Sequence, residues 1–70
     1  MRKRLKEARL RAGYTQQQIA VRLGTSQQTI SKYERAIITP QHFRQLREYE
    51  QLLGVGAEQL FPDVFKKSQI

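Results

Sequence analysis

The chain has 70 residues, of which 13 are Lys or Arg and 6 are Asp or Glu, so its formal net charge is +7. This length suits one small domain, and the absence of cysteine excludes both disulfides and thiolate metal sites as sources of stability. No stretch is long and apolar enough to span a membrane and the amino terminus lacks a signal-peptide core, so we expect a cytoplasmic protein.

The positive charge is concentrated in the first half of the chain. Residues 1–35 contain nine basic and two acidic residues, a net charge of +7, whereas residues 36–70 contain four of each. A basic surface confined to one part of a chain indicates a polyanionic partner. An anionic membrane fits less well, because the basic residues do not line an amphipathic helix with a broad apolar face. Nucleic acid is therefore the favoured partner.

Residues 1–12 predict the first helix. Leu5, Ala8 and Ala12 share one helical stripe, and Gly13 ends the helix. The other positions carry several basic residues that we interpret as a solvated face, with some of them near phosphate: Arg2, Lys3, Arg4, Lys6 and Arg11.

The second helix has three agreeing signals at its start. Thr15 and Gln18 form a capping-box pattern, and Tyr14 is placed to pack on Ile19 as a hydrophobic staple. Gln16, the first helical residue, offers its backbone N–H and its side-chain amide at a positive helix end. That arrangement suits a DNA phosphate.

Residues 16–35 predict two short helices joined by a tight turn. Gly24 occupies the position that needs a left-handed backbone, and either Thr25 or Ser26 can cap the second helix. This is the helix-turn-helix plan, in which the second helix enters the DNA major groove. The positions where the helices touch are apolar or small: Ile19, Ala20, Leu23, Ile30 and Tyr33.

The second helix of this pair opens with Gln27 and Gln28 and continues through Ser31 and Lys32. A glutamine near a helix start can make two hydrogen bonds to adenine, and lysine can donate to guanine. We therefore interpret Gln27, Gln28, Ser31 and Lys32 as base-reading residues. The alternative is that glutamines simply fill exposed helical positions, since the chain has ten of them. For Lys32, a phosphate contact is an equal alternative.

A fourth helix is predicted over residues 41–53, entered after Pro40, and a short last helix over residues 57–60. Arg44 lies near the preceding loop and is an expected phosphate ligand. His42 has no second ligand or neighbouring nucleophile, which indicates a surface residue. The apolar stripe of the fourth helix is Phe43, Leu46, Tyr49 and Leu53, with Glu50 intruding beside it.

Residues 2–61 resemble the Cro/CI-type helix-turn-helix family, also called the XRE family, which includes lambdoid phage repressors. The resemblance implies an all-α fold, a compact lambda-repressor-like bundle of five helices with the helix-turn-helix at helices 2 and 3. It also implies that Gln16, Gln27, Gln28 and Lys32 face DNA. The residues that carry it are Thr15-Gln16, Ile19-Ala20, Leu23-Gly24, Ile30, Tyr33-Glu34, Pro40, Leu52-Leu53-Gly54-Val55 and Leu60-Phe61.

The same resemblance implies a partly buried ion pair between Arg9 and Glu34, which would brace the first helix against the recognition helix and orient Arg9 near phosphate. The alternative is two unrelated surface charges. Ala36 departs from the family pattern, which has glycine there, so we expect the helix to run on or end differently. Ile37 and Ile38 stand where phosphate-binding lysines are usual; one of them either packs into the core or forms part of a dimer contact.

The end of the chain leaves a choice open. Val64 and Phe65 either fold back onto the domain or meet a partner, and a dimer surface built from the last helix and tail is one hypothesis. We expect one DNA-binding domain over residues 1–65 and a frayed tail over residues 66–70.

These observations favour a sequence-specific regulator of transcription that binds double-stranded DNA, with a phage, prophage or bacterial chromosomal repressor as the expected form. A homodimer would bind a near-palindromic operator through a recognition helix at residues 26–35, in the nucleoid of the cytoplasm. The expected phosphate contacts are Arg9, Gln16, Arg35 and Arg44.

Two other classes of function compete with this interpretation. The alternative regulator is an antitoxin or other partner-binding protein of a toxin–antitoxin or mobile-element system, using Ile37, Ile38 or the tail. An enzyme has little support, because the sequence shows no Gly-rich phosphate loop, no metal-ligand cluster and only one histidine. Accordingly, no cofactor is expected.

Overall fold

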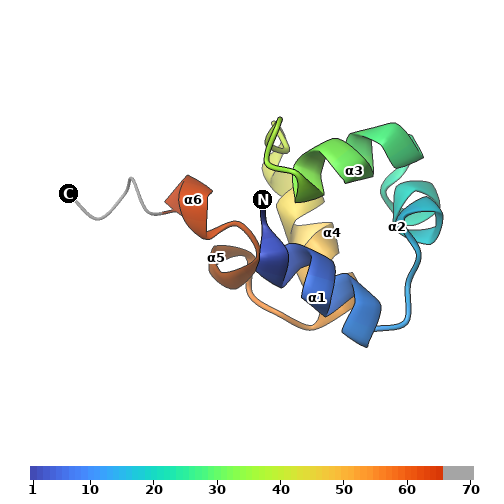
Figure 1. Cartoon of the computed structure of the whole chain (residues 1–70), viewed down its shortest axis with the longest axis horizontal. Helices are drawn as coiled ribbons and strands as arrows, with labels where there is room; N and C mark the ends of the chain where they lie inside the picture. The colour runs from blue at the N-terminus through green and yellow to red at the C-terminus, as the bar shows by residue number, and fades with distance from the viewer. Residues whose placement is uncertain (66–70) are drawn as a thin grey trace.

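The structure is a computed structural model that describes residues 1–65, and within them every regular element is a helix. This confirms the all-α class, and the expected tail at residues 66–70 lies outside the described residues. The five expected helices are present, and a further short helix, α6, follows them (Figure 1). The helices are α1 (Lys3–Arg11), α2 (Gln16–Leu23), α3 (Gln27–Glu34), α4 (Phe43–Leu53), α5 (Ala57–Leu60) and α6 (Pro62–Phe65).

Local signals set the helix-turn-helix boundaries as predicted. The Thr15 hydroxyl accepts from the Gln18 N–H at 3.1 Å, and the Gln18 side chain accepts from the Thr15 N–H at 2.9 Å, which completes the capping box. Gly24 ends α2 with a φ of 71°, a left-handed conformation that costs glycine nothing. Ser26, rather than Thr25, caps α3 by accepting from the Thr29 N–H at 3.2 Å.

A single hydrophobic core packs α2 and α3 against the other helices. Tyr49 of α4 lies at its centre, with edge-to-face ring contacts to Tyr33 at 6.3 Å and to Phe61 at 5.5 Å between ring centroids. In Figure 1, α3 lies across the top of the domain and α2 at its right, with α1 and α5 below them. The buried apolar residues are Leu5, Ile19, Ala20, Leu23, Ile30, Tyr33, Leu46, Tyr49, Leu53, Ala57, Leu60 and Phe61.

Two residues predicted for the core lie outside it. Phe43 is 66% exposed, because α4 begins only at this residue and its first turn extends beyond the helices that cover Leu46, Tyr49 and Leu53. Ala12 is also exposed, since it follows the last residue of α1. Both residues belong to a predicted apolar stripe, but each lies at a helix end that the other helices do not cover.

The end of α3 corrects a second prediction. Ala36 adopts the left-handed conformation with a φ of 62°, so the helix ends as it would with glycine. The Ala36 N–H donates to Tyr33 O at 3.1 Å and the Ile37 N–H donates to Lys32 O at 2.9 Å, the two bonds of a Schellman motif. Those bonds, together with the contacts of the following loop, outweigh the steric cost of the alanine Cβ.

The residues after Ala36 also depart from one expectation. Ile37 is 58% exposed and Ile38 39% exposed, so the prediction that one of them packs into the core is wrong.

Glu50, which intrudes beside the apolar stripe of α4, has a structural role: its carboxylate accepts from the Ala57 N–H at 2.6 Å, at the start of α5. Val64 and Phe65 fold back and pack, partly buried, against the core. None of the helices within residues 1–65 is long and apolar enough to cross a membrane.

Candidate nucleic-acid interface

The outer surface of α3 carries the four residues predicted to read bases. Gln27, Gln28 and Lys32 are exposed and Ser31 is partly buried, while Ile30 and Tyr33 on the inner side enter the core. Positions three and four residues apart are neighbours on a helical surface, as 27 and 31, 28 and 31, and 28 and 32 are, so the four side chains form one polar face. We call these four residues the α3 polar face.

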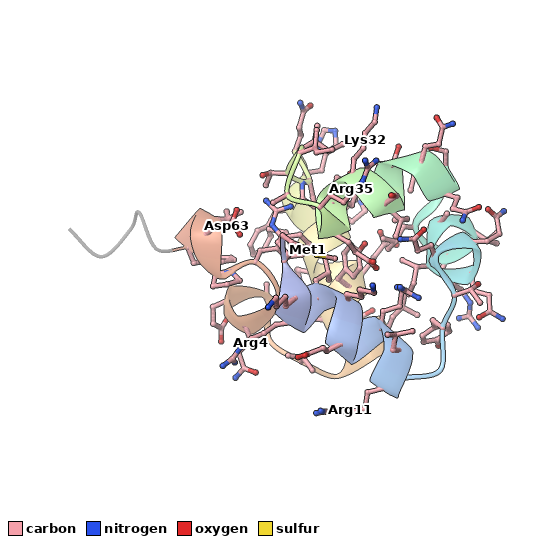
Figure 2. The ribbon with its side chains drawn as sticks, in the orientation of Figure 1. Met1, Arg4, Arg11, Lys32, Arg35 and Asp63 are labelled. Atoms are coloured by element: carbon pink, nitrogen blue, oxygen red, sulfur yellow. The ribbon has the colours of Figure 1, made fainter. Side chains whose placement is uncertain are left out.

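Two cations stand at the carboxyl end of α3: Lys32, which belongs to the α3 polar face, and Arg35, which follows the helix. Lys32 and Arg35 project from the outer side of the molecule in Figure 2. The Arg35 Nε–H donates to Ser31 O at 3.4 Å, near the last turn of the helix, where a cation is favoured by the helix dipole. Neither residue takes part in an ion pair within the described part of the chain.

A buried network fixes the α3 polar face relative to the rest of the domain. The Arg9 Nε–H donates to Glu34 Oε2 at 2.5 Å, and Arg9 Nη2 donates to Glu34 Oε1 at 3.3 Å. Gln16 Nε2 also donates to Glu34 Oε1, at 3.1 Å. Glu34 of α3 therefore joins α1 to the first residue of α2.

This network changes the roles expected of Arg9 and Gln16. The Arg9 guanidinium is buried and directed inward, where its Nη1 also donates to Tyr14 O at 2.9 Å. The guanidinium thus supports α3 from behind, and its expected contact with phosphate stays a prediction. The side chain of Gln16 is likewise engaged with Glu34, so the group at this position that suits a phosphate is the amino end of α2 itself, where the first backbone N–H groups lack helical partners.

Arg44 belongs to α4 and not to α3. It is exposed on the first turn of α4 and lines a surface hollow with Leu23 at the end of α2 and with the exposed Phe43. Among the predicted phosphate ligands, the structure therefore places Arg35 beside the α3 polar face, Arg44 at the start of α4, and Arg9 in the interior.

Arg2 was interpreted as part of a solvated face, and this was wrong. Only 5% of the residue is exposed. Its Nη1 donates to Tyr33 O at 2.6 Å and to Ile38 O at 2.8 Å, and its Nη2 donates to Thr39 Oγ1 at 2.9 Å. No local pattern marks these contacts, because Arg2 is separated from its partners by more than 30 residues along the chain.

Asp63 of α6 completes the surroundings of Arg2. Its two carboxylate oxygens accept from Arg2 Nε and Nη2, each at 2.9 Å, and the guanidinium lies 5.0 Å from the centroid of the Phe61 ring. The hydrogen bonds from Arg2 hold the pKa of Asp63 below its ordinary value. We call Arg2 and Asp63 the terminal clamp, because they join the first helix to the last described one.

Burial is the main cause of the raised pKa values of two core tyrosines, Tyr33 and Tyr49. It raises the pKa of Tyr33, whose hydroxyl donates to Gln45 Oε1 at 3.1 Å. It also raises the pKa of Tyr49, with a further contribution from the charge of Glu34. Both side chains therefore stay neutral at physiological pH and act through packing and hydrogen bonding.

The basic residues of the first half are divided between two sides of the molecule. Arg4 and Arg11 line a groove with Ala8, Leu53 and Val55, and Figure 2 shows both on the side opposite Lys32 and Arg35. Arg2 and Arg9 are buried in ion pairs. The net charge of +7 in residues 1–35 therefore overstates the positive charge beside α3, because Arg2 and Arg9 are paired and Arg4 and Arg11 lie on the opposite side.

In residues 1–65 no group of three or more His, Asp and Glu side chains is placed to hold a metal ion. A family model described as helix-turn-helix matches residues 5–60, a span that runs from within α1 to the end of α5. Comparison with curated proteins and with solved structures yields no significant match.

Proposed function

Because the chain belongs to the XRE-type helix-turn-helix family, a family of DNA-binding regulators, we propose that it is a repressor that reads a near-palindromic operator as a dimer. The observation that carries this proposal is the α3 polar face, which combines two exposed glutamines with Lys32 on a helix held by the core on its other side.

The dimensions of α3 suit the major groove. An α-helix with its side chains is about 10–12 Å in diameter, and the major groove of B-DNA is about 12 Å wide, so α3 can enter it side-on. Gln27 and Gln28 stand at the amino end of α3, the part of a recognition helix that contacts base edges. Each can accept from the adenine N6 amino group and donate to adenine N7, so we expect half-sites that contain adenines.

Phosphate contacts then set the register. Arg35 and Lys32 lie at the carboxyl end of α3, and the amino end of α2 and Arg44 supply two further positions. Contacts of this kind fix orientation without reading sequence. Arg9 has a supporting role through Glu34, since a shift of that pair would move α3 relative to α2.

Dimerisation is supported by the exposed Ile37 and Ile38. They follow directly after α3, where two apolar side chains in solvent indicate a surface for another protein chain. A two-fold pair of domains would place the recognition helices roughly 34 Å apart, one turn of DNA.

The same exposed residues favour a second candidate function. Ile37, Ile38 and the exposed Phe43 also suit a different protein partner, such as the toxin of a toxin–antitoxin pair. In that case DNA binding would regulate the protein's own synthesis while occupation of the partner would be its main role. A strictly monomeric protein on DNA that captures no partner would argue against both readings of this surface.

Selection from a randomised duplex library at near-physiological salt, with RNA as competitor, tests the proposal. We expect an enriched near-palindrome with adenines in each half-site. Analytical ultracentrifugation on the selected duplex should then show two chains per site. Binding without enrichment would contradict base reading by α3 and reduce the surface to a phosphate clamp.

A further inference from the structure

The terminal clamp adds side-chain hydrogen bonds to a loop that is otherwise held by its backbone bonds to the end of α3. The loop from Ala36 to Thr39 is exposed, and Arg2 donates to Tyr33 O on one side of Ala36 and to Ile38 O on the other. The backbone N–H of Arg2 also donates to Glu34 O at 2.8 Å. The buried side chain of Arg2 thus binds both the carboxyl end of α3 and the loop that follows it.

This loop contains an unfavourable conformation. Ala36 has a φ of 62°, which for a residue with a Cβ is disfavoured by about 1–2 kcal/mol. Such a conformation persists only when the surrounding contacts determine it. The bonds from Arg2 lie on both sides of this residue, so they oppose its relaxation and keep Ile37 and Ile38 in place.

We propose that Arg2 and Asp63 are positioning residues for DNA binding: the terminal clamp fixes the carboxyl end of α3 and the loop 36–39 in the arrangement that fits the duplex. This inference rests on the proposed function. Asp63 acts through Arg2, since its two oxygens occupy Nε and Nη2 and orient the guanidinium so that Nη1 meets both carbonyls. The last described helix is thereby coupled to the recognition helix.

Electrostatics alone predicts the opposite effect of an Asp63 substitution on DNA affinity, so the direction of the change distinguishes the two explanations. Asp63 is a carboxylate whose side chain is 52% exposed, at the end of the clamp that also holds α3. Removing a negative charge from a DNA-binding protein strengthens association with a polyanion. If Asp63 had no positioning role, its loss would therefore leave DNA binding equal or tighter.

The experiment compares Asp63→Ala with Glu7→Ala. Both changes remove one negative charge; Glu7 is exposed, lines the groove with Arg4 and Arg11, and forms no ion pair in the described residues. Circular dichroism first establishes a temperature at which both variants and the unmodified protein are fully folded. Fluorescence anisotropy at that temperature then measures Kd on the selected duplex.

We expect Asp63→Ala to weaken binding about threefold to tenfold and Glu7→Ala to leave it equal or tighter. We also expect shifts of the Ile37 and Ile38 amide resonances in Asp63→Ala but not in Glu7→Ala. Adding Ala36→Gly to Asp63→Ala should recover part of the affinity, because glycine holds the left-handed conformation without the clamp.

Two outcomes would overturn the inference, and they are distinct. Tight binding by folded Asp63→Ala with unchanged loop resonances would show that Asp63 is structural only, and the proposed function would stand. Failure of the unmodified protein to bind any duplex would overturn the proposed function and this inference with it. The conservative change Arg2→Lys is the second variant: full affinity with only one amine in place of the guanidinium would also contradict positioning by the clamp.

Discussion

Arg9 of α1 and Glu34 of α3 form a buried ion pair in which Arg9 Nε lies 2.5 Å from Glu34 Oε2. Glu34 is the last residue of α3, and its second oxygen also accepts from Gln16 of α2. One carboxylate therefore joins three helices at the base of the α3 polar face. Its consequences differ from those of a surface salt bridge, because neither charge can be returned to water without opening the domain.

Replacing Glu34 by Gln should destabilise the domain by about 3 kcal/mol, since it leaves the buried Arg9 charge without its partner. Urea denaturation followed by circular dichroism measures this. The double variant Arg9→Met with Glu34→Leu should cost clearly less than Glu34→Gln alone, because apolar residues of similar volume replace both charges. A single variant as stable as the unmodified protein would contradict the burial of the pair.

Replacing Gln28 by Ala should weaken binding to the selected operator by about 1–3 kcal/mol and relax the preference at one base pair. Gln59→Ala is the matched control, as this exposed glutamine lies on α5 and lines the groove with Arg4 and Arg11, away from the α3 polar face. Anisotropy titrations on the operator and on single-base variants provide the measurement. Equal weakening on every sequence would show that Gln28 only contacts the backbone.

Replacing Lys32 by Ala should lower the slope of log Kd against log salt by about one unit, as expected for the loss of one phosphate contact. Arg4→Ala changes the net charge equally but lies on the side opposite Lys32 (Figure 2), so its slope should match that of the unmodified protein. Titrations from low to high salt distinguish the two. Equal slopes for both variants would mean that the duplex does not approach through α3.

Replacing Ala36 by Gly should raise the stability of the domain by about 1 kcal/mol, because glycine tolerates a positive φ. Ala12→Gly provides a control of opposite sign: Ala12 has a φ of −78°, so glycine there only adds freedom to the unfolded chain. Thermal melts of both variants give the comparison. A destabilised Ala36→Gly variant would show that the left-handed conformation is not strained.

Replacing Tyr49 by Phe should leave stability unchanged or raise it. The Tyr49 hydroxyl is buried and finds no hydrogen-bond partner among the described residues, so its removal relieves an unfavourable desolvation. Tyr33→Phe is the counterpart; it loses the bond to Gln45 and should cost about 1 kcal/mol. Loss of several kcal/mol in Tyr49→Phe would indicate a partner for the hydroxyl, such as a buried water.

The local signals were sufficient for the helix-turn-helix itself. A capping box, a glycine at the end of α2 and apolar residues three and four positions apart are interactions between near neighbours, so they can be read without knowing the fold. The same holds for α5, predicted at residues 57–60 and found at Ala57–Leu60. The α3 polar face follows from these boundaries, because the buried side of a short helix determines its exposed side. Its role in reading bases stays a prediction.

The tertiary structure alone decided which side chains of the same type are buried and which are exposed to solvent. Arg2 and Arg4 are both arginines of a basic run, yet Arg2 is buried among acceptors from α3, the following loop and α6. Ile37 and Phe43 are apolar but exposed, since the core ends before it reaches them. A long side chain can reach either solvent or an acceptor, and an apolar one is buried only where other elements cover it. The sequence by itself determined the all-α class, the helix-turn-helix and the outward face of α3; the contacts between distant segments determined which charges remain free to meet a partner.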